Sequence, residues 1–384
     1  MRETRAFGIL TASAAALVVL TACTGAEPAG GVAERAFNPH PLGGWAGSGR
    51  RPGPAHRHRL LNHPREESMR TVPFGTTGTE APNVVAGMMR ISGSTDERIR
   101  ELYTASREAG IDFFDHADLY GFNHPGGGIH LCERQFAEAL RLSPSEREQI
   151  TLQTKTGIVA QPWGYDQSYE HIVGSVDESL KALGTDYLDV LLLHRPDALV
   201  EPEEVARAFD HLESSGKVRA FGVSNHTPRQ IDLLKTAVTQ PIVADQVQLS
   251  ITHSTIIAQG LSSNMTAQED SITRDGGGIV DYARVNKITL QAWSPFQKAF
   301  QDGVFLDSPD YPELNAELEH LATKYQVTPT AIAVAWITRH PAGIQVVLGT
   351  TTPRRVTDAA AGSDIPLTRS EWYGLIQAAG HNVP

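Results

Sequence analysis

Residues 187–225 read YLDVLLLHRPDALVEPEEVARAFDHLESSGKVRAFGVSN, and this stretch indicates the fold. Leu188–Leu193 is predicted to be a strand, and its part Val190–Leu193 is apolar at consecutive positions, as expected for a strand that is buried on both faces. A helical stretch, Pro202–Ser214, follows it, and a second short apolar run, Ala220–Val223, comes next. A strand, a helix and another strand at this spacing indicate a right-handed crossover in a parallel sheet.

The same alternation continues in both directions along the chain. Eight strand–helix units in about 300 residues favour an α/β fold of the closed (β/α)8 kind, a TIM barrel with parallel strands. An open dinucleotide-binding sheet would need Gly-x-Gly-x-x-Gly after its first strand, where Ala86–Arg90 stands instead. The predicted pairs of strand and helix are Val84–Ile91 with Thr95–Ala109, Phe113–Asp115 with Glu133–Leu142, Ile150–Thr154 with Tyr169–Leu183, Leu188–Leu193 with Pro202–Ser214, Ala220–Val223 with Pro228–Ala237, Ala244–Leu249 with Thr273–Asn286, Thr289–Trp293 with Glu313–Tyr325, and Gln345–Leu348 with Pro353–Ala361.

Composition excludes several classes of protein. The chain has 384 residues, of which 40% are apolar, so it can build a core without disulfides. Its net charge of −11 works against generic binding to nucleic acid or to anionic lipid, and we expect no nucleic-acid partner. The two cysteines, Cys23 and Cys132, are too far apart in sequence for a metal-ligand spacing. No metal site is expected from them.

Residues 1–68 differ from the rest of the chain, with a net charge of +3 against −14 for residues 69–384. Arg2 and Arg5 precede an apolar stretch that ends before Cys23, so residues 1–23 resemble a bacterial lipoprotein signal. That stretch is too short for a membrane span. Residues 24–68 lack periodicity and are rich in Pro, Gly, Arg and His, which predicts disorder. We therefore assign residues 69–384 to the barrel.

Polar side chains stand where the predicted strands end. Asp115 ends strand 2, with Tyr120 five residues further on; Lys155 follows strand 3 and His194 follows strand 4. Active sites of such barrels lie at the C-terminal ends of the strands, so these four residues are candidates for the chemistry. The glycine triplets at 126–128 and 276–278 follow no predicted strand and are interpreted as flexible loops.

This set of four residues resembles the aldo-keto reductase superfamily, which has an Asp and a Tyr five residues apart after strand 2, a Lys after strand 3 and a His after strand 4. Residues 187–196 and 216–225 resemble two of its signature stretches. Within the superfamily, a group of bacterial aldo/keto oxidoreductases is most similar to this chain in sequence at Asp115–Gly121 and at Cys132-Glu133. The resemblance covers Val72–Pro384 and implies an NADP-dependent oxidoreductase that reduces small aldehydes or ketones to alcohols.

Residue chemistry agrees with the roles that the resemblance implies for these four side chains. A tyrosine is a weak acid near neutral pH, and a cation beside it stabilises its anion. Lys155 would supply that cation to Tyr120, and Asp115 would hold Lys155 as an ammonium. His194 would hydrogen-bond the carbonyl oxygen and orient it. The structural alternative is an Asp–Lys pair that only closes the barrel.

The resemblance also implies a site for NADPH/NADP. Ser224, Asn225 and Gln246 would hydrogen-bond the nicotinamide carboxamide, and Trp293 would stack on the ring. Gly349 stands where the family often has a lysine, which weakens the expected preference for NADP. The remaining cofactor candidates are Met88 as an apolar wall, Ser294, Pro295 and Phe296 along the pyrophosphate, and Thr350 and Arg355 at the adenosine 2′-phosphate.

Two other functions stay open. A metal-dependent hydrolase would use His116, Asp118 and His194 as ligands, but the His-x-His usual after strand 1 is missing. A regulatory barrel would bind nicotinamide as a sensor with little turnover. Location is also open between a lipoprotein anchored through Cys23 and a cytoplasmic protein that starts at Met69. We favour the cytoplasm, where NADPH is available.

Overall fold

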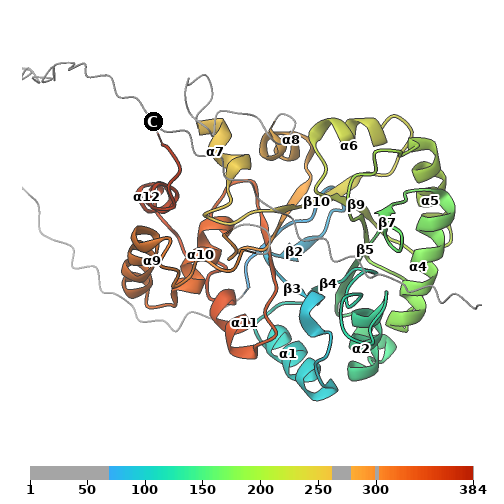
Figure 1. Ribbon diagram of the computed structural model, residues 1–384, viewed down its shortest axis with the longest axis horizontal. Helices are drawn as coiled ribbons and strands as arrows, with labels where there is room; N and C mark the ends of the chain where they lie inside the picture. Colours follow the sequence, from blue (N-terminus) through green and yellow to red (C-terminus); the bar gives the residue numbers. More distant parts are fainter. Residues whose placement is uncertain (1–68, 262–277, 299–301, 384) are drawn as a thin grey trace, which may run out of the picture. The chain divides into compact units, whose positions relative to one another are not determined.

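The computed structural model describes residues 69–261, 278–298 and 302–383. In this part of the chain, eight parallel strands close into a barrel, which confirms the predicted TIM barrel (Figure 1). Neighbouring strands follow the chain order, and the last strand pairs with the first through Val346 and Val84. In barrel order the strands are β3 (Val84–Gly87), β4 (Phe113–Asp115), β5 (Thr151–Thr156), β8 (Val190–Leu193), β9 (Phe221–Ser224), β10 (Ile242–Gln248), β11 (Thr289–Trp293) and β12 (Gln345–Leu348).

Helices surround the barrel and connect its strands (Figure 1). Several begin at a hydroxyl that caps the first turn: Thr95 accepts a hydrogen bond from the backbone N–H of Arg98, and Ser168 accepts one from that of His171. The helices are α1 (Asp96–Glu108), α2 (Leu131–Leu140), α3 (Pro144–Arg147), α4 (Tyr169–Leu183), α5 (Pro202–Ser214), α6 (Pro228–Leu234), α7 (Thr255–Leu261), α8 (Ile279–Asn286), α9 (Pro312–Tyr325), α10 (Pro329–Thr338), α11 (Pro353–Ala360) and α12 (Arg369–Ala378).

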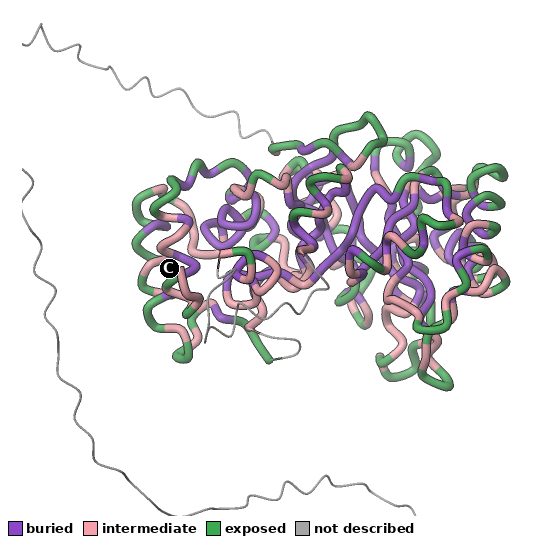
Figure 2. The backbone as a smooth tube through the Cα atoms, turned by 90° about the horizontal axis from the view of Figure 1, so that it is seen from above, coloured by how far each residue is buried: buried purple, intermediate pink, exposed green. Residues whose placement is uncertain are grey.

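The core has two layers, because successive strand residues point to opposite faces. The larger layer lies between strands and helices, and the smaller one fills the barrel interior. Buried residues gather in the middle of the fold, and exposed ones lie mainly around its outside (Figure 2). A hairpin of β1 (Thr71–Pro73) and β2 (Glu80–Pro82) adds Phe74 to the interior layer. The ring of Phe74 meets that of Phe113 edge-on at 5.5 Å. The hairpin therefore closes the end of the barrel opposite to the predicted active site.

The observed elements differ from the predicted ones at several places. Strand β3 ends at Gly87 instead of Ile91, because the backbone N–H of Met88 donates to the carbonyl of Asp115 and Met89–Ile91 form the 3-10 helix η1. A second hairpin, β6 (Ile158–Ala160) and β7 (Trp163–Tyr165), was not predicted.

Helices α10 and α12 were also missed. Every residue of α10 from Ala331 to Thr338 is buried, so its sequence carries no polar face and no helical period. Trp336 of α10 stacks on Trp372 of α12 at 5.0 Å, and each indole N–H donates to the backbone carbonyl of the other tryptophan. This reciprocal contact holds α12 against the helix layer.

Some predictions fall outside the described residues. These are the signal-like segment 1–23 with Cys23, the disordered segment 24–68, the helix start at Thr273, and residues 276 and 277 of the second glycine triplet. Within the described ranges, no helix is long and apolar enough to cross a membrane.

Glycines in the barrel wall give a first prediction. A Cβ at Gly87 would lie 2.4 Å from the carbonyl oxygen of Leu348 on the neighbouring strand, whereas Gly174 in α4 has open space around it. Gly87→Ala should therefore lower the free energy of unfolding by about 1–3 kcal/mol. Gly174→Ala should raise it by about 0.5–1 kcal/mol, because alanine favours the helix. Denaturant unfolding of both variants measures this, and equal stabilities would contradict the strand contact.

Candidate active site

Asp115, Tyr120 and Lys155 meet at the C-terminal ends of β4 and β5. Lys155 is fully buried, and its Nζ donates to Asp115 Oδ2 at 2.8 Å and to Tyr120 Oη at 3.0 Å. A third hydrogen bond runs from Nζ to the backbone carbonyl of His116 at 2.7 Å. An ammonium has three N–H donors, so each one has an acceptor here. This fixes the position of Nζ beside the phenol.

The backbone beyond β4 places Tyr120. The N–H of His116 donates to the carbonyl of Gln153, and that of Asp118 donates to the carbonyl of Lys155, so the chain continues alongside β5. It then turns, and the carbonyl of Tyr120 accepts a hydrogen bond from the N–H of Cys132 in α2. Tyr120 is therefore held from both β5 and α2.

The buried ion pair sets the proton equilibria of the site. Burial by itself would lower the pKa of Lys155, but Asp115 and Tyr120 raise it above its ordinary value. Burial raises the pKa of Tyr120, and Lys155 offsets part of that rise. Lys155 is therefore an ammonium and Tyr120 a neutral phenol at neutral pH.

His194 follows β8 and lies beside Tyr120, with the two rings 5.9 Å apart and nearly perpendicular. Burial lowers the pKa of His194 well below its ordinary value, and Lys155 and Arg195 lower it further. The imidazole is thus neutral near pH 7. Its Nδ1 is buried and has no hydrogen-bond partner among the described residues. The structure brings all four predicted residues together into a phenol, an ammonium, a carboxylate and a neutral imidazole.

Two glutamines, one of them absent from the predicted site, also touch Asp115. Its Oδ1 accepts from Gln153 Nε2 at 2.6 Å and from Gln246 Nε2 at 3.0 Å. Gln153 stands two residues before Lys155 on the same strand, so the two side chains share a face. That period-2 relation is the signal that would have singled out Gln153.

The predicted nicotinamide residues lie on the adjoining strands β9, β10 and β11. Ser224 Oγ donates to the carbonyl of Gln246 at 2.8 Å and accepts from Asn225 Nδ2 at 2.8 Å. Trp293 Nε1 donates to Asn225 Oδ1 at 3.0 Å. Asn225 has φ 59°, a left-handed conformation that asparagine tolerates. Together these residues form one hydrogen-bonded edge of the barrel mouth.

Neighbouring side chains complete that edge. The guanidinium of Arg195, which sequence reasoning missed, lies 5.6 Å from the ring centre of Trp293. Met88 is buried in the core, Pro295 is buried, and Phe296 packs on the core from a half-buried position. Ser294 has φ 54° and turns the chain after β11.

The predicted phosphate-binding residues lie around the N-terminus of α11. Arg355 is exposed in the first turn and forms no ion pair within the described part of the chain. Arg354 instead faces Asp358 at 4.0 Å. Thr350 Oγ1 accepts from the N–H of Thr352 at 3.1 Å. An unpaired guanidinium at a helix N-terminus fits an anion such as a phosphate.

The side chain of Arg90 brings a second positive charge to Gly349, directly after β12. Arg90 Nη1 donates to the carbonyl of Gly349 at 3.3 Å, and Arg90 is exposed. Its guanidinium lies within 4 Å of the position that a Cβ at Gly349 would take. A positive charge is therefore present beside Gly349, where the family often has a lysine. Sequence reasoning missed Arg90, because residue 90 was assigned to a strand.

The residues of the metal-hydrolase alternative do not form a metal site. His116 is fully buried, its ring meets that of Phe136 edge-on at 4.7 Å, and burial lowers its pKa to about 4. Asp118 accepts a hydrogen bond from Ser175 Oγ at 2.8 Å. Across residues 69–261, 278–298 and 302–383, no group of three or more His, Cys, Asp or Glu side chains is placed to hold a metal ion.

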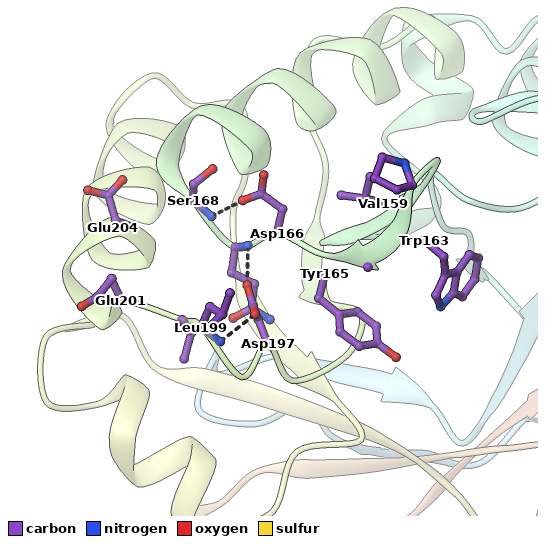
Figure 3. A pocket seen from close by; sticks show the side chains of 13 residues that line it. Val159, Trp163, Tyr165, Asp166, Ser168, Asp197, Leu199, Glu201 and Glu204 are labelled. Carbon is purple, nitrogen blue, oxygen red and sulfur yellow. Dashed lines mark hydrogen bonds between the residues drawn. The ribbon is translucent and has the colours of Figure 1, made fainter.

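A pocket of about 430 Å³ lies beside the β6–β7 hairpin, after the C-terminal end of β5 (Figure 3). Trp163 lines it with 62% of its surface exposed. Asp197 Oδ2 accepts from the N–H of Gln167 at 3.2 Å, and Gln167 Nε2 donates to the carbonyl of Arg195 at 2.7 Å. None of the four candidate residues Asp115, Tyr120, Lys155 and His194 lines this pocket. The hydrogen bonds of Gln167 connect the pocket wall to the segment that carries His194 and Arg195.

Known proteins resemble this chain in sequence and in fold. A 6-dehydroglucose reductase of Agrobacterium fabrum is 33% identical over 312 residues, covering 78% of this chain and 95% of that protein. The protein named uncharacterized oxidoreductase YcsN of Bacillus subtilis is 32% identical over 314 residues, with 78% and 95% covered. The crystal structure of the thermostable aldo-keto reductase Tm1743, 24% identical, matches with a TM-score of 0.64 over 81% of this chain and all of that one. This last likeness shows a shared fold.

The family model described as "Aldo/keto reductase family" matches residues 83–378, which is most of the described barrel. The bacterial relatives agree with the predicted bacterial group. The chain belongs to the aldo/keto reductase family, whose enzymes reduce small carbonyl compounds with a nicotinamide cofactor.

Proposed function

We propose that this protein reduces aldehydes or ketones to alcohols with NADPH, and that Tyr120 is the proton donor. The observation that carries the proposal is the set of three hydrogen bonds from Lys155 Nζ, one of which ends on Tyr120 Oη. This geometry places a fixed positive charge at the atom that loses a proton. A purely structural Asp–Lys pair would not need the phenol as its third partner.

The nearby side chains have separate tasks in this reaction. The hydride for the carbonyl carbon would come from NADPH when it is bound. Tyr120 donates its proton to the carbonyl oxygen, and Lys155 stabilises the phenolate that remains. Asp115 keeps Lys155 charged. Neutral His194 offers a ring N–H to the same oxygen and fixes the angle of the carbonyl.

The cofactor is proposed to extend from the predicted nicotinamide residues at the ends of β9, β10 and β11 to the predicted phosphate-binding residues at the N-terminus of α11. Asn225, Ser224 and Gln246 would hold the carboxamide, with Trp293 against the ring. Because Asp115 can only accept hydrogen bonds, Gln246 turns its NH2 group toward Asp115 and keeps its amide oxygen for other donors. Thr350 and Arg355 would hold the 2′-phosphate.

Location and substrate are part of the same proposal. An NADPH-dependent reductase needs the cytoplasmic cofactor pool, so we propose a cytoplasmic protein whose fold begins near Met69. A lipid on Cys23, detected by mass spectrometry of the native protein, would contradict this and favour a membrane anchor. Relatives named 6-dehydroglucose reductase make 6-dehydroglucose one aldehyde to test.

Turnover tests the function directly. The purified chain should oxidise NADPH in the presence of an activated aldehyde such as 4-nitrobenzaldehyde, without added metal. Loss of absorbance at 340 nm measures the reaction, and 6-dehydroglucose, ketones and quinones extend the panel. NADPH binding without turnover on any of these substrates would favour the regulatory barrel.

Removal of the phenol tests the role of Tyr120. Tyr120→Phe should lower kcat by at least about 100-fold, because general acid catalysis contributes about 10²–10⁴-fold. The Kd for NADPH should stay unchanged, since the ring remains. Tyr325→Phe is the matched control, because its hydroxyl bonds to Glu371 on the outer helix layer, and it should keep wild-type kcat. A wild-type kcat in Tyr120→Phe would remove this residue from the mechanism.

Cofactor preference tests the phosphate site. A charge-assisted contact between Arg355 and the 2′-phosphate should favour NADPH over NADH by about 10-fold, the lower end of the range for such contacts. Arg355→Ala should therefore raise the Kd for NADPH about 10-fold and leave that for NADH unchanged. Arg354→Ala, which removes a charge already facing Asp358, is the control and should change neither. Equal losses for both cofactors in Arg355→Ala would assign Arg355 a structural role.

A further inference from the structure

Four buried glutamine amides form a continuous chain through the barrel interior. Gln153 and Gln246 both donate to Gln291 Oε1, at 2.9 and 3.1 Å. Gln291 Nε2 donates to Gln153 Oε1 at 3.2 Å and to Gln345 Oε1 at 3.0 Å. Gln345 Nε2 then donates to the carbonyl of Pro82, at the end of β2, at 2.7 Å. This amide chain runs from Asp115 through Gln153 and Gln246, which both bond to Gln291, and then through Gln345 to the N-terminal hairpin.

Buried amides are costly unless they are hydrogen-bonded, and barrel interiors are usually filled by branched aliphatic residues. Here Gln153, Gln291 and Gln345 have no exposed surface, and Gln246 has 3%. Both N–H groups of Gln153, Gln246 and Gln291 have acceptors. Because each of these NH2 groups must face its acceptors, every amide in the set is held in a single orientation.

The chain ends on the oxygen of Asp115 that does not face Lys155. Gln153 and Gln246 donate to Oδ1, and Lys155 donates to Oδ2. Without these amides, the carboxylate is free to rotate and bind Nζ through both oxygens. Nζ has three hydrogens, so a second hydrogen bond to Asp115 leaves only one hydrogen for two acceptors, Tyr120 Oη and the carbonyl of His116.

We propose that Gln153 is a positioning residue for the proton-donating step: it holds the Asp115 carboxylate so that one Lys155 hydrogen stays on Tyr120. The inference rests on the proposed function and goes beyond it, since Gln153 touches neither Tyr120 nor the carbonyl substrate. Gln153 makes the shorter of the two contacts to Asp115 and stands on the same strand as Lys155.

Gln153→Met removes the amide and keeps the length of the side chain. It should lower kcat about 10-fold, as loss of a hydrogen bond to a charged group implies, with unchanged Kd for NADPH and unchanged KM for the aldehyde. The solvent deuterium isotope effect on kcat should rise, because proton donation becomes the slower step. A purely structural role would leave the isotope effect unchanged.

Gln240→Met is the matched control, since it makes the same substitution in a buried amide that donates to Asp210 and Glu213, outside the amide chain. It should keep the wild-type kcat and isotope effect. Gln153→Glu should recover activity at low pH, where a protonated carboxyl can still donate to Asp115, and lose it as the pH rises. Equal losses of kcat in both methionine variants, or no loss in Gln153→Met, would overturn the proposal.

A structural readout separates this inference from the proposed function. If the wild-type chain binds NADPH and reduces no carbonyl, the proposed function fails and kinetics says nothing of Gln153. Crystal structures of the wild type and of Gln153→Met then decide. The variant should show Lys155 Nζ and Tyr120 Oη beyond 3.5 Å, against 3.0 Å here. An unchanged distance would refute the positioning role. Should Gln153→Met fail to fold, Gln153→Glu serves for the same measurement in crystals at high pH, where the introduced carboxyl is ionised and cannot donate to Asp115.

Discussion

A charged lysine in the middle of a barrel is the constraint on which the rest of the site depends. Lys155 has no contact with solvent, and removal of an ammonium from water costs several kcal/mol unless partners replace the hydration. Asp115 supplies the opposite charge, and two further oxygens complete the shell. The register of β4 against β5 brings these partners within reach, so the barrel's strand pairing and its chemistry are parts of one arrangement.

The sequence predicts the barrel, and it also points to the four candidate residues that the structure brings together, because these stand at or after the ends of the predicted strands. Buried parallel strands leave unbroken apolar runs, and polar residues at their ends, such as Lys155 and His194, are conspicuous. The β6–β7 hairpin could not be predicted in this way, since Pro162 and Gly164 in so short a segment are typical of a loop. Helix α10 was not predicted because it is buried on all sides, and its sequence therefore lacks the polar face that marks an amphipathic helix.

Residues that act through other residues are the hardest to predict. Gln153, Gln291 and Gln345 lie far apart in sequence, and only closure of the sheet brings their amides together. Arg90 is similar, because its proximity to Gly349 depends on the pairing of the first strand with the last. In each case one residue's role depends on a neighbour about 55 to 260 positions away. Alternation along β5 shows that Gln153 shares a face with Lys155, but local pattern does not show which residues of other strands these side chains meet.

The Trp336–Trp372 stack has a consequence for how this protein can be observed. Two indole rings that stack 5.0 Å apart, with planes inclined by 7°, are close enough for their excited states to couple, so the absorption bands of the pair differ from those of separated tryptophans. The pair lies between α10 and α12, in the outer layer, while Trp293 lies at the barrel mouth. The loss of this coupling therefore reports detachment of α12 from α10, whatever happens around Trp293 at the barrel mouth.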